Sequence, residues 1–466
     1  MWTIFSSLRT ASGKGAAIAA PLVLAALIYV PGLAAGGLPK WAVLYAVALV
    51  CLFFVTRFDR VTIAGTAFVA WAGLSGLWGA DASWLPAFHK IATIFLIFLA
   101  AREAASHRQT AWAVALVCVV TIGAAAFYNR YPFINENFGT EWMLMALPLV
   151  LALRPRIVAC LVASAVLCYL AFLNQSKMEF AILPIMAAAF FAFRRQWSMA
   201  VICALLPLAG AAVIPRASLM ESIGPRLEIW GAAIDMWRSY PAGVGLSSFD
   251  HLFPAYQPPD GSWLKLTQYA GAVHNEYLQV LVELGPVGLG FAGVFVFLCL
   301  RHAKESPALY AVIAVGLLAL LGFPLQNAPT AMLAAVCLGI VAGRPEKSLG
   351  VEKGPLRTVV SVAVVAGIGL GAMEVKAHVL YGRAANIMGA DPVKAFELNL
   401  EAHRTYPWDW QIRNQMFATF ANMARTNKVQ INARNLRQIF DISRSASPYS
   451  PRLAKAVSAM QLEPKK

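Results

Sequence analysis

Charged residues are scarce in this sequence. Asp, Glu, Lys and Arg make up 13% of its 466 residues, about half of their share in a typical soluble domain, whereas 59% of the positions are hydrophobic. A water-soluble globule of this size cannot bury so much apolar surface, which excludes a soluble two-domain enzyme, a disordered chain and a fibrous repeat. Apolar runs near the ~20 residues that cross a bilayer recur along the chain, so the sequence predicts an all-α, polytopic membrane protein.

Metal-ligand and disulfide patterns are missing as well. All seven cysteines lie within apolar segments, with no CxxC pair and no Cys/His cluster. No pair of carboxylates has the spacing of metal ligands. We therefore expect no disulfide framework, no zinc site, and no metal or other cofactor.

Ionisable side chains are almost absent from the middle of the apolar segments. Those that occur, Glu141, Lys177, Glu179 and Glu374, lie near predicted span ends. An ion-coupled transporter normally needs charged groups at membrane depth, because they carry the coupling ion. This absence counts against a transporter, although a non-catalytic polysaccharide flippase or transporter stays open as an alternative.

Thirteen apolar segments are candidate transmembrane helices. They cover residues 16–36, 41–56, 61–80, 85–101, 110–128, 141–153, 156–173, 178–193, 198–214, 284–300, 307–323, 328–343 and 358–378. If the N-terminus is cytoplasmic, the inside connections hold 16 Lys and Arg residues and the short outside connections hold 4. This bias supports both the span number and the orientation. Because the basic residues flank the spans, the net charge of +15 does not predict a nucleic-acid partner.

Two hydrophilic segments then fall on the outer side of the membrane, residues 215–283 and residues 379–466. We divide the chain into a transmembrane domain at 1–378, which includes the long loop, and a tail at 379–466. Helix-period stretches in the tail predict two or three short helices packed in repeat-like hairpins. Membrane lipids surround the spans, and the chemistry is expected in the outer segments.

The loop holds side chains that could carry a reaction. Arg226 and Trp230 are four residues apart and share a face if helical, which places a guanidinium suited to phosphate beside a flat ring suited to a sugar. The segment VHNEYLQVLVELGPVGL follows. On a helix His274 would share a face with Leu278 and Leu281, at the helix start above the membrane. A histidine there can accept a proton from a hydroxyl.

The run His274-Asn275, Leu278, Glu283 and Gly285 (HNxxLxxxxExG) resembles the signature of the O-antigen ligase and polymerase superfamily. The preceding residues, which include Arg226, Trp230, Pro241, Gly243, Gly245 and Phe249, are similar to the segment before that signature in those proteins. Weaker resemblance occurs at AWAGLSGLWGADASW near residues 70–84 and at NENFGTEWMLMALP, residues 135–148. The outer helical tail resembles the branch of protein O-oligosaccharyltransferases.

The resemblance implies a GT-C-like membrane glycosyltransferase of the bacterial inner membrane. It would move a glycan en bloc from an undecaprenyl-pyrophosphate carrier to an acceptor hydroxyl, on lipid A-core or on a protein, at the periplasmic face. The implied transfer is inverting and independent of metal. A repeat-unit polymerase of the same superfamily, with a growing chain as acceptor, is the main alternative.

The resemblance also suggests roles for individual residues. His274 is the candidate base, with Glu276 or Asp250 in reserve, and Arg226 is the candidate pyrophosphate contact. Many family members have a Ser-Arg pair where this chain has Ser176-Lys177, and lysine keeps the charge but loses the bidentate fork. Further candidate substrate contacts are Asn275, Arg238, Trp230 and Glu283.

Each candidate residue also has a plainer interpretation. A histidine at a helix start can be a cap or a solvated side chain, and an interfacial arginine is often a lipid-headgroup anchor. Glu283 could only orient its helix, and the tryptophans could belong to the membrane-interface belt. Gly243 and Gly245 favour a tight turn over a phosphate-binding loop.

The base can be tested by pH. A histidine base with an unperturbed pKa predicts activity that falls as the pH drops through about 6–7.

Overall fold

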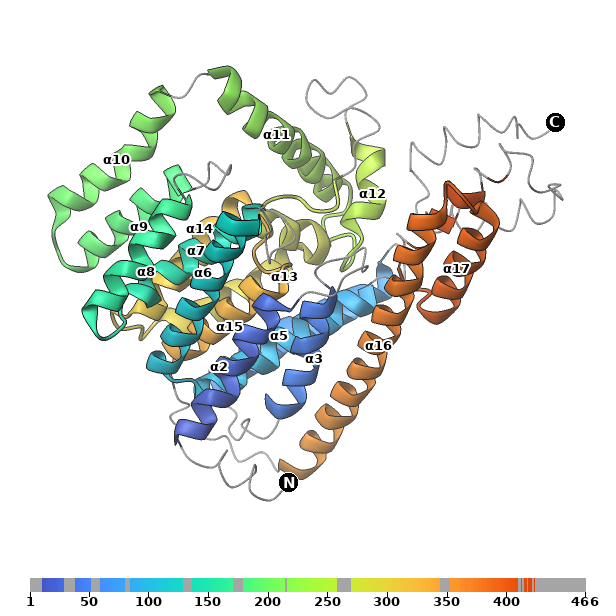
Figure 1. The fold of residues 1–466 in the computed structure, drawn as a ribbon, viewed down its shortest axis with the longest axis horizontal. Helices are drawn as coiled ribbons and strands as arrows, with labels where there is room; N and C mark the ends of the chain where they lie inside the picture. Colours follow the sequence, from blue (N-terminus) through green and yellow to red (C-terminus); the bar gives the residue numbers. More distant parts are fainter. Residues whose placement is uncertain are drawn as a thin grey trace.

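The structure is a computed structural model, and in the part of the chain that it describes every regular element is a helix (Figure 1). It describes residues 11–28, 38–51, 59–79, 84–128, 136–170, 179–213, 216–257, 270–343, 353–409, 412, 415–416, 418–420 and 423. The all-α prediction is confirmed for these residues. The helices are α2 (Ala11–Leu27), α3 (Leu38–Cys51), α4 (Arg60–Ser75), η1 (Gly76–Trp78), α5 (Trp84–Ala104), α6 (His107–Tyr128), α7 (Glu136–Leu151), α8 (Arg156–Cys168), α9 (Glu179–Phe193), α10 (Trp197–Val213), α11 (Arg216–Ser239), α12 (Phe249–Tyr256), α13 (Glu276–Leu300), α14 (Pro307–Leu321), α15 (Ala328–Ala342), α16 (Lys353–Ile387) and α17 (Pro392–Thr405).

Each predicted span overlaps one of these helices in its described residues, from residues 16–36 with α2 to residues 358–378 with α16. Within the described ranges, three helical segments are long and apolar enough to cross a membrane: Arg60–Trp78, Trp84–Ala104 and Glu276–Leu300. Other apolar helices are shorter, such as Pro307–Leu321 and Ala328–Ala342. These helices support a membrane protein, whereas the span number of thirteen and the orientation stay predictions.

The centre of the helical bundle is formed by α7 and α15. On α7, Trp142, Met143 and Leu144 are fully buried. The sequence of α15, APTAMLAAVCLGIVA, is rich in small residues. Gly339 on α15 lies so close to α5 that an added Cβ would be 2.8 Å from the Cβ of Ala101. Small residues of this kind let helices pack closely in lipid, where the hydrophobic effect does not drive helix association.

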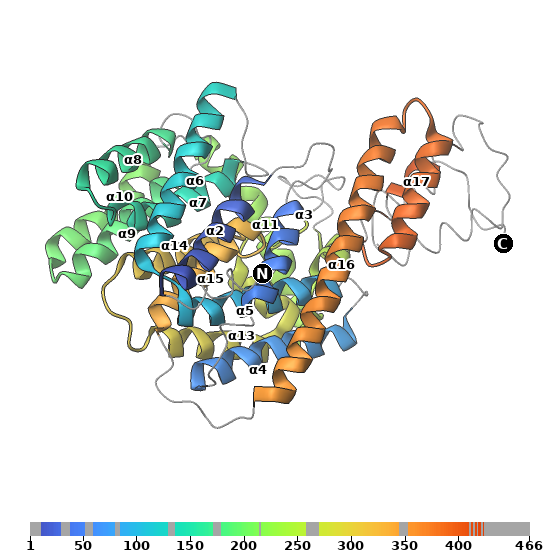
Figure 2. The same ribbon diagram turned by 60° about the horizontal axis from the view of Figure 1, so that its bottom comes forward.

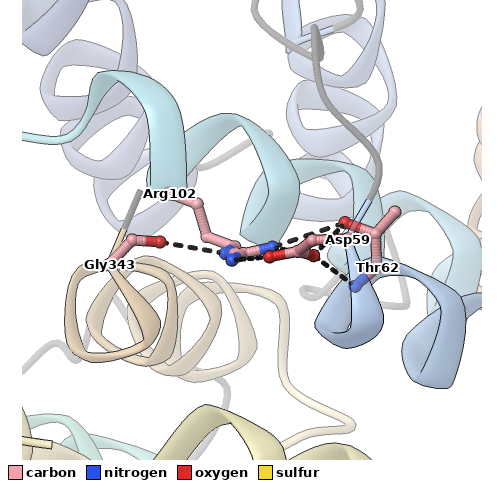
Figure 3. Close-up of polar contacts among 4 residues, drawn as sticks. All are labelled: Asp59, Thr62, Arg102 and Gly343. Carbon is pink, nitrogen blue, oxygen red and sulfur yellow. Dashed lines mark hydrogen bonds and ion pairs between the residues drawn. The ribbon is translucent and has the colours of Figure 1, made fainter. Parts of the chain in front are cut away.

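A buried ion pair ties three helix ends together at one end of the bundle (Figure 3). Arg102 near the end of α5 donates to both carboxylate oxygens of Asp59, at 2.9 and 2.7 Å, and its Nε donates to the carbonyl of Gly343 after α15 at 3.1 Å. Asp59 is the N-cap of α4 and accepts from Thr62 N at 2.9 Å. Burial opposes ionisation, yet the hydrogen bonds from Arg102 and Thr62 hold the pKa of Asp59 at about 2.

Helix α13 is broken at Gly285, where φ is +69° and ψ is −176°. The next residue is Pro286, which has no N–H to donate to the carbonyl of Val282. That carbonyl accepts from Val244 N at 2.9 Å instead, and the carbonyl of Glu283 accepts from Gly245 N at 2.9 Å. The break therefore creates a docking point for the loop segment 243–245.

The predicted hydrophilic loop, residues 215–283, is largely helical. Helix α11 packs against α12 and α13, along the upper side of the molecule in Figure 1. Its buried face, with Ile229, Ala233 and Met236, meets Phe249 and Phe253 of α12 in a small separate core. This core fixes α11 over the start of α13.

Helix α16 is continuous across the predicted domain boundary at 378/379. Its C-terminal part and α17 stand away from the bundle in two views (Figures 1 and 2). Helix α17 packs back on α16 through Ala377, Leu380, Ala402 and Tyr406. The hairpin places His378 Nε2 2.8 Å from Asp409 Oδ2. The described part of the tail thus contains one helical hairpin.

Candidate functional site

His274 lies at the junction between the outer loop and α13. It precedes the helix, because Asn275 is the N-cap and its side chain accepts from Leu278 N at 3.0 Å. His274 therefore lies at the start of the helix, where the sequence placed it, but it precedes the N-cap and so does not share a helix face with Leu278 and Leu281. The φ of His274 is +56°, a left-handed conformation that is uncommon for this residue type. Its ring packs edge-on against Phe323, with 4.8 Å between the ring centroids.

The other half of the site lies on α11. Arg226 and Trp230 both belong to this helix, and both are half-buried. The indole Nε1 of Trp230 donates to the carbonyl of Val273 at 3.0 Å, directly before His274. The structure therefore gives Trp230 a protein partner beside the histidine.

Electrostatics connect the two halves of the site. Burial and the nearby positive charge of Arg226 lower the pKa of His274 from 6.5 to about 4. Burial also lowers the pKa of Arg226, although a guanidinium remains protonated at physiological pH. A neutral imidazole, which can accept a proton, thus lies within the electrostatic influence of a cation, which can bind an anionic group.

The glycines of the motif shape the backbone. Gly243 N donates to the carbonyl of Tyr240 at 2.9 Å, which closes a turn, while the N–H groups of residues 244 and 245 donate to α13. An added Cβ on Gly243 would lie 2.5 Å from the carbonyl oxygen of Glu283. Because all three N–H groups have protein acceptors, this segment is built as a turn, and the phosphate-binding interpretation loses its donors.

Glu283 is buried inside this arrangement. Its Oε1 accepts from Gln279 Nε2 at 2.8 Å and from Phe249 N at 3.4 Å. These contacts favour the plainer interpretation, in which the carboxylate orients the loop, over direct contact with substrate. A carboxylate that already accepts protein donors is also a poor partner for a pyrophosphate.

The two reserve carboxylates lie on either side of this centre. Glu276 begins α13, is buried, and accepts from Leu325 N at 3.0 Å. Asp250 lies on α12, with its Oδ1 3.7 Å from His251 Nε2. Glu276 therefore connects the histidine segment to the turn between α14 and α15, which also carries Phe323.

Of the predicted substrate contacts in the described part of the chain, Arg238 lies away from this site. Arg238 is exposed near the end of α11 and pairs with Asp235 at 3.1 Å. Twelve residues of helix separate it from Arg226, which corresponds to about 18 Å. Lys177 lies outside the described residues, together with Ser176.

The structure adds residues that the motif did not indicate. Trp71 Nε1 donates to the carbonyl of Leu284 at 2.8 Å, and Trp78 Nε1 donates to the carbonyl of Gly243 at 3.2 Å. Both tryptophans lie in the weakly similar segment near residues 70–84, which was a usable signal. Phe323 and Gln279 had no such signal, because their roles depend on contacts between distant segments.

Among the residues that the structure describes, no group of three or more His, Cys, Asp or Glu side chains could hold a metal ion. The chemistry available from the described side chains is therefore that of a cation and a proton acceptor. Independence from metal stays a prediction.

Comparison with known proteins finds one family. A family model described as O-antigen ligase matches residues 92–293, which run from α5 into α13. No curated protein matches the chain. The matched residues contain both Arg226 and His274, and the match agrees with the superfamily that the sequence motif indicated.

Proposed function

We propose that the chain transfers a lipid-linked glycan en bloc to an acceptor hydroxyl at the outer face of the bacterial inner membrane, because residues 92–293 match the family model described as O-antigen ligase, a family of glycan transfer. The donor is an undecaprenyl-pyrophosphate glycan, and the acceptor is lipid A-core or a protein. The observation that supports the proposal most directly is the hydrogen bond of 3.0 Å from Trp230, one turn after Arg226 on α11, to the carbonyl of Val273, the residue directly before His274.

Arg226 would bind the pyrophosphate. As the bond between the anomeric carbon and the pyrophosphate oxygen breaks, the leaving group keeps the electron pair and gains negative charge. A guanidinium stabilises that charge most strongly in the transition state. Metal is not required for this role, since the cation is supplied by the protein.

His274 would act on the acceptor. Its neutral ring nitrogen takes the hydroxyl proton as the acceptor oxygen forms its bond to the anomeric carbon on the face opposite the leaving group, which inverts the configuration. In the free protein the pKa of His274 is only about 4, which makes a weak base. The bound pyrophosphate offsets the charge of Arg226 and so raises that pKa when the donor is in place. Proton acceptance is thereby coupled to donor binding.

The decisive experiment is glycan transfer by the purified protein in detergent. It is incubated with an undecaprenyl-pyrophosphate glycan and either lipid A-core or a pilin-like protein, and the acceptor that gains sugar is identified by mass. His274→Ala is the matched control, and it should lose transfer while it still binds donor. A ladder of products without any foreign acceptor would show a repeat-unit polymerase instead, and no transfer to any acceptor would refute the proposal.

A further inference from the structure

Two hydrogen bonds hold the backbone of Val273, the residue directly before His274. The carbonyl of Val273 accepts from Trp230 Nε1 at 3.0 Å, and the N–H of Val273 donates to Gln279 Oε1 at 2.7 Å. Val273 itself is fully buried. One residue of backbone is thus fixed by two side chains that come from α11 and α13.

This double attachment matters because His274 has an unfavourable backbone. Residues with a β-carbon rarely adopt positive φ, and such a conformation persists only where its surroundings enforce it. At His274 the surroundings are the anchored Val273 on one side and the N-cap Asn275 on the other. The direction of the imidazole therefore depends on the hydrogen bonds of its neighbour.

The amide of Gln279 can face only one way in this arrangement. Its Nε2 donates to Glu283 Oε1 at 2.8 Å, and that oxygen also receives the N–H of Phe249. Because a backbone N–H can only donate, the N–H of Val273 requires the amide oxygen on its side and leaves the amide nitrogen to donate to Glu283. Glu283 therefore acts on the histidine through Gln279.

We propose that Gln279 is a positioning residue for His274, and that it works together with Trp230 by clamping the peptide of Val273 between α13 and α11. This inference rests on the proposed function, in which His274 receives the acceptor proton. Neither side chain needs to touch substrate. The clamp also explains why Arg226 and Trp230 share one helix face, since the helix that carries the cation also fixes the base.

The test uses full-length protein in detergent and the glycan transfer assay. Gln279→Met keeps the approximate volume of the side chain but removes both hydrogen bonds, and Trp230→Phe removes the N–H donor while it keeps a smaller aromatic ring. Each should lower kcat about 10–100-fold with little change in the KM for the donor, because misplacement of a reacting group by about 1 Å can cost 10²-fold. Gln196→Met, at an exposed position in the turn between α9 and α10, is the matched control and should retain the wild-type kcat.

A second comparison separates positioning from a general loss of structure. In the His274→Ala background, Gln279→Met should change kcat by less than about 2-fold, because residues that act as a unit are not additive. A further loss of 10-fold or more in that background would overturn the assignment. Trp230→Phe should behave in the same way, and since it is an independent substitution that keeps an aromatic ring, it covers the case in which Gln279→Met fails to fold.

The results also distinguish this inference from the proposed function. If the wild type transfers glycan and His274→Ala is impaired, a normal kcat in Gln279→Met shows that the positioning assignment alone is wrong. If the wild type transfers nothing, or His274→Ala is fully active, the proposed function fails and the assignment fails with it.

Discussion

At the scale of single residues, the structure changes the expected pH dependence of His274. An ordinary histidine would be protonated below about pH 6–7, but burial and Arg226 lower the pKa to about 4. The free protein therefore keeps a neutral imidazole down to about pH 4–5. We predict that kcat/KM for the donor falls only below that range, whereas kcat falls at a higher pH, because the bound pyrophosphate raises the pKa in the complex. Steady-state kinetics from pH 4 to 8 measure the acid limb of kcat/KM and the acid limb of kcat. Two acid limbs that coincide near pH 6–7 would contradict the lowered pKa of His274 in the free protein.

Arg226 gives a second prediction at this scale. Arg226→Ala should lower kcat/KM by an amount equivalent to about 2–4 kcal/mol, because a charge-assisted contact to the leaving group is lost. Arg226→Lys should recover part of the activity, since the charge remains without the fork. Removal of the cation also raises the pKa of His274, so the acid limb of kcat/KM should move to higher pH in Arg226→Ala. Arg301→Ala, at an exposed position after α13, serves as the control. Unchanged turnover in Arg226→Ala would leave the residue as a lipid-headgroup anchor.

At the scale of elements, the break in α13 can be tested by two glycine substitutions in one helix. Gly285 has a backbone conformation that is almost restricted to glycine, and an added Cβ would lie 2.4 Å from the carbonyl oxygen of Ala242. Gly285→Ala should therefore cost at least about 2 kcal/mol of stability and reduce transfer. Gly293→Ala is the matched control, because nothing lies within 4 Å of its added Cβ. Melting curves in detergent compare the two, and equal stability would contradict the role of the break.

The ion pair between Arg102 and Asp59 gives the second prediction at this scale. Arg102→Ala leaves Asp59 largely buried without its cation and should cost about 3–5 kcal/mol. The pKa of Asp59 is near 2, so the ion pair remains formed at neutral and mildly acidic pH and is lost only as the pH falls through about 2. Arg194→Ala, which removes an exposed pair with Glu305, should cost about 1 kcal/mol or less. A similar fall in melting temperature for the two variants would contradict a stabilising role of the ion pair between Arg102 and Asp59.

The same scale shows what the sequence could predict. Apolar runs located the helices, because a helix that crosses a bilayer needs about 20 predominantly apolar residues. The run beginning at residue 284 did not reveal that α13 starts at Glu276. The first turns of that helix carry Glu276, Gln279 and Glu283, which face α12 and the turn after α14 instead of lipid. Such polar positions are decided by partners far along the chain.

The sequence predicted the candidate reacting residues of the site but not the residues that hold them in place. The spacing in the motif indicated His274 and Arg226, because those side chains carry the chemistry. The residues that hold them, such as Gln279 and Phe323, could not be predicted from spacing. Their partners are set by how α11, α12 and the turn before α15 meet around α13, and that arrangement has no local signature.

At the scale of the whole molecule, topology is the main prediction. With thirteen spans and a cytoplasmic N-terminus, residues beyond 378 lie in the periplasm. An alkaline phosphatase fusion after residue 400 should be active, and a fusion at residue 347, in a connection predicted to be cytoplasmic, should be inactive. Activity of only a cytoplasmic reporter at residue 400 would show that the span number is wrong.

Helix α16 sets the distance between the predicted membrane span and α17. It continues without a break from the predicted span at 358–378 to Ile387, so nine further residues extend it by about 14 Å. A flexible linker of the same length would let α17 sample many heights above the bilayer, but a helix allows one. With residues 358–378 in the membrane as predicted, any molecule that binds the α16–α17 hairpin is presented to the membrane surface at a fixed distance. Deletion of four residues from α16 would lower it by about 6 Å and turn it by only about 40°.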